Sequence, residues 1–129
     1  MTAIVHPRDV DDPRPVLVED GEDWLVQGFR CDACGYHLAA SRPRCPVCKG
    51  SLFEHRYGPE GTVWSATVLR AGVPDRDPPI GLAYVDLDDG PRVLCHVATT
   101  GVEPGLLAPG SRVTLAGLTE RDDPKVRVS

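Results

Sequence analysis

Aromatic residues are scarce in this chain, at 5% of 129 residues, and no apolar run approaches the roughly 20 residues that a membrane-spanning helix requires. The first 20 residues also lack the apolar core of a secretory signal peptide, so we expect a cytoplasmic protein. Three functional patterns are missing as well: a P-loop, a GxGxxG turn that opens a helix, and a GxSxG nucleophile elbow. These absences favour a binding module over an enzyme.

Glycine and proline are abundant, with 13 residues of each. Both interrupt helices, so they predict short strands joined by turns.

The net charge of −5 is unevenly distributed. Residues 29–52 carry four basic residues and one acidic residue, a net charge of +3, whereas residues 53–129 carry eight basic and eleven acidic residues, a net charge of −3. Only the first of these segments would attract a phosphate backbone.

Four of the five cysteines form two pairs with the same spacing, Cys31-x2-Cys34 and Cys45-x2-Cys48. Two such loops allow four thiolates to converge on one tetrahedral zinc ion, at about 2.3 Å each. Because the protein would fill all four positions, the zinc is expected to be structural and not catalytic. Two disulfides or a redox-active CxxC are less favoured alternatives in a cytosolic chain. An iron ion would accept the same four ligands.

Residues beyond the cysteines have the pattern of a small β-barrel. Runs rich in β-branched and aromatic residues predict strands over 62–70, 80–87, 91–99, 112–118 and 125–128, and a helical turn is expected within 101–110. A meander of three strands followed by a break predicts a five-stranded Greek-key barrel, the OB-fold, although an SH3-like barrel would give similar strands. The sequence therefore predicts a mainly β protein.

The expected organisation has three parts. Residues 1–23 are rich in proline and aspartate and are expected to be irregular, apart from a short extended piece at 16–18. Residues 24–54 should form a rubredoxin-like zinc ribbon, and residues 55–129 the OB-fold domain. The loop at 71–79 joins the first two barrel strands, and it would flank the ligand face of an OB-fold, either as a mobile linker or ordered against a partner.

The start of the barrel has the pattern G-x-V-x-S-x-T, formed by Gly61, Val63, Ser65 and Thr67, directly after the ribbon. Two further segments, GLAYVDLDDGPRVLCHV at 81–97 and PGSRV at 109–113, complete a likeness that covers roughly residues 24–129. In these features the chain resembles the zinc-ribbon OB-fold proteins of the "domain of unknown function 35" family, which are associated with acyl-CoA.

That resemblance implies a non-catalytic partner of thiolase-like enzymes, of hydroxymethylglutaryl-CoA synthase, or of hydratases that act on CoA thioesters. Such partners serve lipid, steroid side-chain or polyketide metabolism, and they help to hold the CoA thioester or complete the substrate channel of the enzyme. The metal ligands transfer directly to the four paired cysteines. The residues that we consider for contact with acyl-CoA or with the partner are Arg30, Arg42, Arg44, Lys49 and Trp64. A solvated basic surface, or a patch that meets an acidic partner surface, explains the four cations equally well.

Single-stranded nucleic acid is the main alternative ligand, because OB-folds bind it with a basic groove and stacked aromatics. Trp64 and Tyr84 are candidates for stacking, but the acidic barrel and the few aromatics argue against this function.

Catalysis has less support. Cys95 and His96 are neighbours on a predicted strand, so their side chains point to opposite faces and cannot form a dyad. Other polar residues are assigned to the turn or the surface: Asp86, Asp88, Asp89, His37 and His55.

Overall fold

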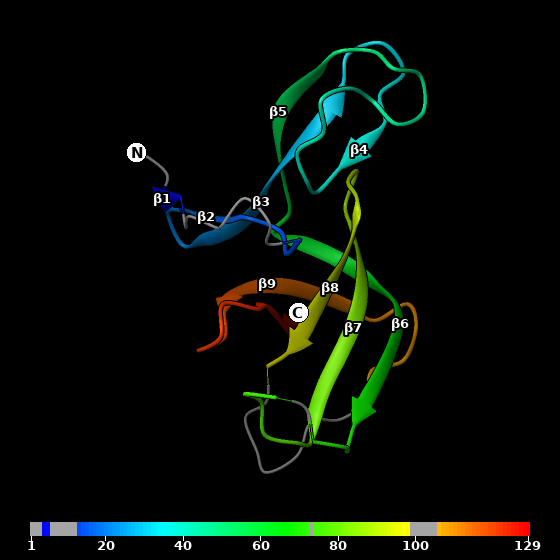
Figure 1. Cartoon of the computed structure of the whole chain (residues 1–129). Coiled ribbons are helices and arrows are strands. Elements are labelled where there is room, and N and C mark those ends of the chain that lie inside the picture. The colour runs from blue at the N-terminus through cyan, green and yellow to red at the C-terminus, as the bar shows by residue number, and fades with distance from the viewer. Residues whose placement is uncertain (1–3, 6–12, 73, 99–105) are drawn as a thin grey trace.

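The computed structural model describes residues 4–5, 13–72, 74–98 and 106–129 (Figure 1). The elements in these ranges are all strands: β1 (Ile4–Val5), β2 (Leu17–Asp20), β3 (Asp23–Cys31), β4 (His37–Leu38), β5 (Leu52–Tyr57), β6 (Glu60–Leu69), β7 (Ile80–Leu87), β8 (Arg92–Val97), β9 (Arg112–Leu118) and β10 (Pro124–Val128). Within them, no helix has the length and apolar character that crossing a bilayer would require.

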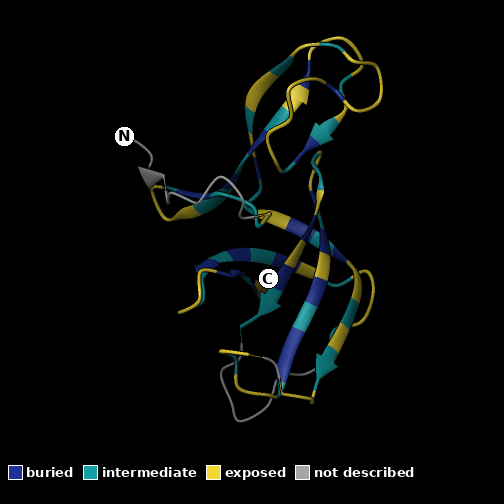
Figure 2. Ribbon diagram, viewed as in Figure 1, coloured by how far each residue is buried: buried dark blue, intermediate teal, exposed yellow. Residues whose placement is uncertain are grey.

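The last five strands close into a barrel with the order β10-β8-β7-β6-β9. Neighbouring strands are antiparallel except for β10 and β8, which run parallel with Lys125 opposite His96. Each strand alternates between a buried and a more exposed face, as Figure 2 shows along β7. On β7 and β8 the residues that face the core include Val85, Val93 and Cys95. This closed arrangement confirms the predicted OB-fold.

The barrel's first strand is irregular at one point, and this irregularity positions Trp64. The register between β6 and β7 shifts between Val63 and Ser65, as in a β-bulge. A bulge places an additional residue on one strand, so alternation is interrupted there. Val63 is buried, whereas Trp64 and Ser65 are both exposed. The large indole ring therefore lies on the outer surface of the barrel, beside Tyr84 of β7.

The first five strands form a second sheet, the ribbon sheet, which carries the cysteine loops. In it β3 pairs with β2 and β4 along one edge and with β5 along the other. Figure 1 shows this sheet above the barrel, with β4 close to the tip of the β7–β8 hairpin. The two sheets share one buried cluster, because Leu17, Val26 and Tyr57 of the ribbon sheet pack with Val85 and Val113 of the barrel.

Parts of the expected organisation differ from the structure. The segment 1–23 was expected to be irregular apart from an extended piece at 16–18, but two strands, β1 and β2, lie within it. Strand β2 overlaps the expected piece and extends to Asp20, and its Leu17 and Val18 are fully buried against β3. Strand β5 continues to Tyr57, beyond the expected ribbon boundary at residue 54. Most of the helical turn expected within 101–110 falls at residues 101–105, outside the described residues, as do residues 1–3 and 6–12.

Candidate functional site

The four paired cysteines meet at the far end of the ribbon sheet. Cys31 ends β3, Cys34 follows in the first loop, and Cys45 and Cys48 come from the second loop. Their four Sγ atoms all lie within 4.8 Å of one another, with 3.4 Å between Cys31 and Cys48 and 3.7 Å between Cys34 and Cys45. Sulfurs bound to one tetrahedral zinc would be about 3.8 Å apart, whereas a disulfide requires about 2.05 Å. The free thiols therefore fit a shared ion.

Backbone geometry supports the same interpretation. The N–H groups of Cys34, Val47 and Gly50 point at sulfurs, with nitrogen-to-sulfur distances of 3.5, 3.4 and 3.4 Å. Such N–H donors orient and stabilise metal-bound thiolates. Gly50 is needed because a Cβ at this position would lie 3.0 Å from the Cys31 sulfur. The left-handed residue of the second loop is Lys49, with φ of 63°.

The electrostatics of the four thiols also favour a bound cation. The N–H group of Cys34 is the main reason that the pKa of Cys31 falls to about 7. At Cys48 the N–H group of Gly50 lowers the pKa, but the neighbouring sulfurs of Cys31 and Cys34 outweigh it and raise the pKa to about 12. Four thiolates this close repel one another unless a positive charge lies between them. A divalent ion that prefers sulfur, such as zinc, satisfies that requirement.

The cations considered for ligand contact are all exposed. Arg30 lies opposite His37 on the β3–β4 pair, and Arg44 donates to the carbonyl of Lys49 at 3.3 Å, within its own loop. Arg42 lines a hollow described below. Trp64 lies on the barrel and is 52% exposed.

Sequence reasoning missed Arg92, whose guanidinium carbon is 3.8 Å from the centre of the Trp64 ring. Arg92 also donates to the carboxylate of Asp86 at 2.7 and 3.1 Å, directly across the β7–β8 hairpin. The register of the predicted hairpin could have indicated that pair. Asp88 pairs in a similar way with Arg112, at 2.6 Å. These aspartates are therefore engaged in ion pairs on the outer surface and do not form a catalytic cluster.

Three hollows follow the ribbon and the outer face of the barrel. The largest, about 740 Å³, lies between the cysteine loops and β4 on one side and the turn of the β7–β8 hairpin on the other. A second, about 320 Å³, lies between the segment 13–15 and the outer face of β8. A third, about 240 Å³, lies beside Tyr84 and Leu94. The principal side chains around the first are Tyr36, His37, Arg42, Val47, Pro91 and Arg92.

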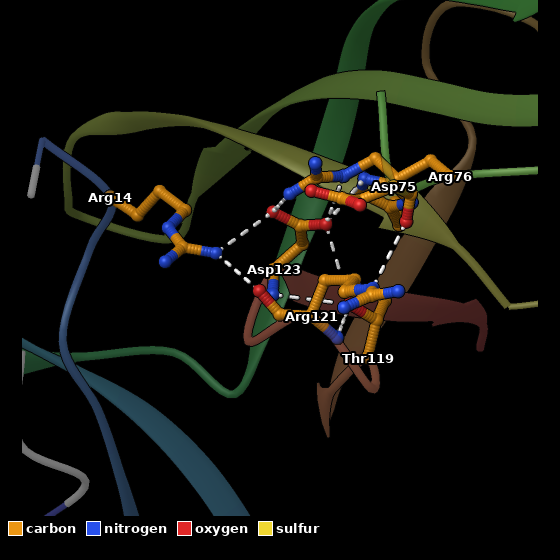
Figure 3. Close-up of polar contacts among 7 residues, drawn as sticks. Arg14, Asp75, Arg76, Thr119, Arg121 and Asp123 are labelled. Carbon is orange, nitrogen blue, oxygen red and sulfur yellow. Dashed lines mark hydrogen bonds and ion pairs between the residues drawn. The ribbon is translucent and has the colours of Figure 1, made fainter. Parts of the chain in front are cut away.

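Asp123 is the buried carboxylate of the described residues, at 7% exposure, and it joins distant segments (Figure 3). Arg76, from the loop between β6 and β7, donates two hydrogen bonds to it at 2.8 Å each. Arg14 donates at 3.2 Å from the segment before β2, and the His96 Nε2 atom lies 3.2 Å away. Asp123 therefore bonds both the 71–79 loop and the segment before β2 to the barrel.

The charges around Asp123 follow from these contacts. Burial raises the pKa of Asp123, but the hydrogen bonds from Arg76 and the nearby positive charges outweigh it and hold the pKa below its ordinary value. Burial also holds the pKa of His96 below its ordinary value, despite the attraction of Asp123. Cys95 lies on the opposite, inner face of β8, where burial raises the pKa of its thiol to about 12. This thiol has no access to a reactant, since its exposure is 0%.

Comparisons with known proteins agree with this architecture. Residues 54–118, about half of the chain, match the family described as "ChsH2, C-terminal OB-fold domain". Among solved structures, the chain is similar to a chain of the "Ltp2-ChsH2(DUF35) aldolase", with 27% sequence identity, a TM-score of 0.63, and coverage of 78% of this chain and 82% of that chain. No curated protein matches it. The family match includes four of the five barrel strands, and the chain therefore belongs to the ChsH2-type OB-fold family, the DUF35 proteins.

Proposed function

We propose that the chain is a non-catalytic accessory subunit of a CoA-thioester enzyme, of the thiolase-like type or a hydratase, whose acyl-CoA site it helps to form. The observation that carries this proposal is the 27% identity, over 78% of the chain, to a chain of a protein whose name joins two components, Ltp2 and ChsH2. The pathway would be one of lipid, steroid or polyketide metabolism. The catalytic residues would belong to the partner.

The described residues of the chain support an auxiliary role. Cys95, the thiol outside the cluster of paired cysteines, is buried and faces away from His96. His96 itself is engaged by Asp123, and Asp86 is paired with an arginine. A reaction needs a nucleophile and a base within hydrogen-bond reach of a bound substrate. None of these groups forms such a pair, which supports a contribution through binding and positioning.

The proposed metal has a structural role in this function. Cys31, Cys34, Cys45 and Cys48 would hold zinc, which when bound supplies a rigid cross-link between two loops that contain little regular structure. The N–H groups that point at the sulfurs keep the loops in the same conformation. Arg42, Val47 and the other loop side chains are then presented in fixed positions beside the barrel. Fixed positions matter because ordering a mobile surface on binding lowers the affinity.

The proposal is tested by identifying a thiolase-like or hydratase-type protein encoded beside the chain, co-expressing the two and purifying by a tag on either protein. We expect a stable complex, with faster acyl-CoA turnover or greater solubility of the enzyme than in its absence. The isolated chain should turn over no CoA ester. If the two proteins do not associate, and the enzyme is equally active and soluble alone, the proposal is wrong.

A second function, the binding of single-stranded nucleic acid, is favoured by one observation. Trp64 and Tyr84 are both about half exposed on the outer face of the barrel, with ring centres 6.1 Å apart. OB-folds use such rings to stack bases. The net charge of −3 over residues 53–129 opposes this function. A fluorescence titration with oligonucleotides at low and high salt distinguishes the two, since a salt-dependent change would support nucleic acid.

A further inference from the structure

The three hollows described above adjoin one another, because neighbouring hollows share lining residues. The 740 Å³ hollow shares Ala39 and Arg92 with the 320 Å³ hollow, which in turn shares Leu82 and Leu94 with the 240 Å³ hollow. Together they form an extended groove, which we call the ribbon–barrel groove. Its lining residues lie on the cysteine loops, at the turn of the β7–β8 hairpin, and along the outer face of β8. Its shape suits a long, narrow ligand.

The two ends of this groove differ in charge. In the part of the chain that the structure describes, no carboxylate lines the upper hollow, although the whole protein has a net charge of −5. Arg42 and Arg92 both line it, and His37 adds a further nitrogen-bearing ring. Arg92 is neutralised in part by Asp86, whereas no ion pair joins Arg42 to a described carboxylate. These two guanidinium groups favour an anion at this end of the groove.

The lower end is apolar. The residues that line it are Ser65, Ala66, Thr67, Leu82, Ala83, Tyr84 and Leu94, none of which carries a charge. Leu94 and Tyr84 lie directly opposite each other on β8 and β7 and are 44% and 45% exposed. An apolar chain laid against them would remove this surface from water, which favours binding. A nucleic acid would instead need cations along the whole groove.

The wall between the two ends is already formed. The segment Pro13–Pro15 lines the middle hollow, and Arg14 within it is bonded to the buried Asp123. Two prolines and an ion pair restrict this segment before any ligand arrives. A preformed wall spares the ligand the entropic cost of ordering it.

We propose that the ribbon–barrel groove binds an extended amphipathic anion, with the anionic head beside Arg42 and an acyl chain along Leu94. This chemistry is shared by an acyl-CoA and a free fatty acid. The choice of acyl-CoA as the natural ligand rests on the proposed function, but the groove itself follows from the cavities and their charges. The upper hollow alone, at about 740 Å³, is within the range of small-molecule sites, about 300–1,000 Å³.

The first test is a calorimetric titration of the full-length, zinc-loaded chain with octanoyl-CoA, with CoA and with octanoate. We expect octanoyl-CoA to bind at least about tenfold more tightly than CoA, because two buried methylene groups suffice for that factor. Octanoate binding as tightly as octanoyl-CoA would support the groove and assign the free fatty acid to it. Equal binding of CoA and octanoyl-CoA, or no binding of any of the three, would overturn the proposal.

Two pairs of variants locate the site. Arg42→Ala should lower the affinity for octanoyl-CoA about fivefold, as for the loss of one exposed charge pair, whereas Arg44→Ala, outside the groove, should leave it unchanged. Leu94→Ser should lower the affinity for octanoyl-CoA but not for CoA, and Val128→Ser, also exposed, should change neither. If the two variants of either pair change the affinity for octanoyl-CoA equally, the assignment of the site to the groove is wrong. Unfolding midpoints of the variants, measured in urea, show that each is folded.

Different experimental results would refute the proposed ligand of the groove and the proposed accessory function. Association with the enzyme, together with a lack of octanoyl-CoA binding by the isolated chain, would overturn the groove and leave the accessory role intact. Binding with the expected variant pattern, but no association with the enzyme, would support the groove and refute the accessory role.

Discussion

Replacement of Asp123 by asparagine should destabilise the protein through a single buried charge. The carboxylate accepts two hydrogen bonds from Arg76 and one from Arg14, and it contacts His96. Asp123→Asn keeps the shape but removes the negative charge that both guanidinium groups contact. Removing one partner of a fully buried pair costs about 3–5 kcal/mol. Because both arginine side chains are 32% exposed and regain water, we expect a smaller loss in the free energy of unfolding, about 2 kcal/mol.

Urea unfolding followed by tryptophan fluorescence measures this loss. With a slope of about 2 kcal/mol per molar urea, the midpoint should fall by about 1 M at pH 7. The matched control is Asp122→Asn, since Asp122 is exposed and asparagine tolerates its left-handed φ of 64°. An equal effect of the two substitutions, or no effect of Asp123→Asn, would refute the reasoning.

The pH dependence provides a second measurement on the same residue. The folded-state pKa of Asp123 lies below its ordinary value, so the unfolded chain binds the proton more readily. The stabilisation is complete above the unfolded pKa of about 3.9 and is lost as the pH falls through the lower folded pKa. The difference in stability between wild type and Asp123→Asn should therefore shrink below about pH 4. A difference that stays constant down to pH 2 would contradict this account.

Three further predictions concern the metal and the junction between the sheets. Elemental analysis should find one zinc per chain. A chelator should remove this zinc and lower the midpoint temperature of thermal unfolding. Gly50→Ala should weaken zinc binding, because the new Cβ would lie 3.0 Å from a cysteine sulfur, whereas Gly72→Ala, with nothing within 4 Å, should not. Tyr57→Phe should cost about 1–2 kcal/mol in unfolding free energy by leaving the Phe29 carbonyl without its 2.8 Å donor. Tyr84→Phe, on the exposed face, should have no measurable effect in the same urea assay.

The barrel could be predicted from the sequence because its signals are local. Alternation along β7 and β8 places Val85 and Val93 in the core regardless of what surrounds them, and the strand limits follow from glycines and turns. The cysteine cluster was predictable for the same reason, since each CxxC pair is a short loop. Both depend on residues that are close together along the chain.

The features that could not be predicted depend on distant contacts. Asp123 accepts hydrogen bonds from Arg14 and Arg76, which lie 109 and 47 residues away in the sequence, and no local pattern marks those pairings. The outward position of Trp64 depends on a bulge that simple alternation does not reveal. The extended piece expected at 16–18 overlaps β2, but the sequence did not indicate that this strand pairs with β3, which is the source of its stability.

The junction between the sheets explains how a small protein can keep the ribbon–barrel groove at a fixed width. Tyr57, buried at 2% exposure, lies between backbone from both sides: a Cβ on Gly28 of the ribbon sheet would be 2.9 Å from its ring, and a Cβ on Gly90 of the β7–β8 hairpin would be 2.6 Å from it. Its hydroxyl donates to Phe29 and lies 3.2 Å from the Nδ1 atom of His37. His37 and Gly90 line opposite walls of the upper hollow. One ring therefore contacts both walls, so the spacing of the groove is set by close packing, which resists small displacements.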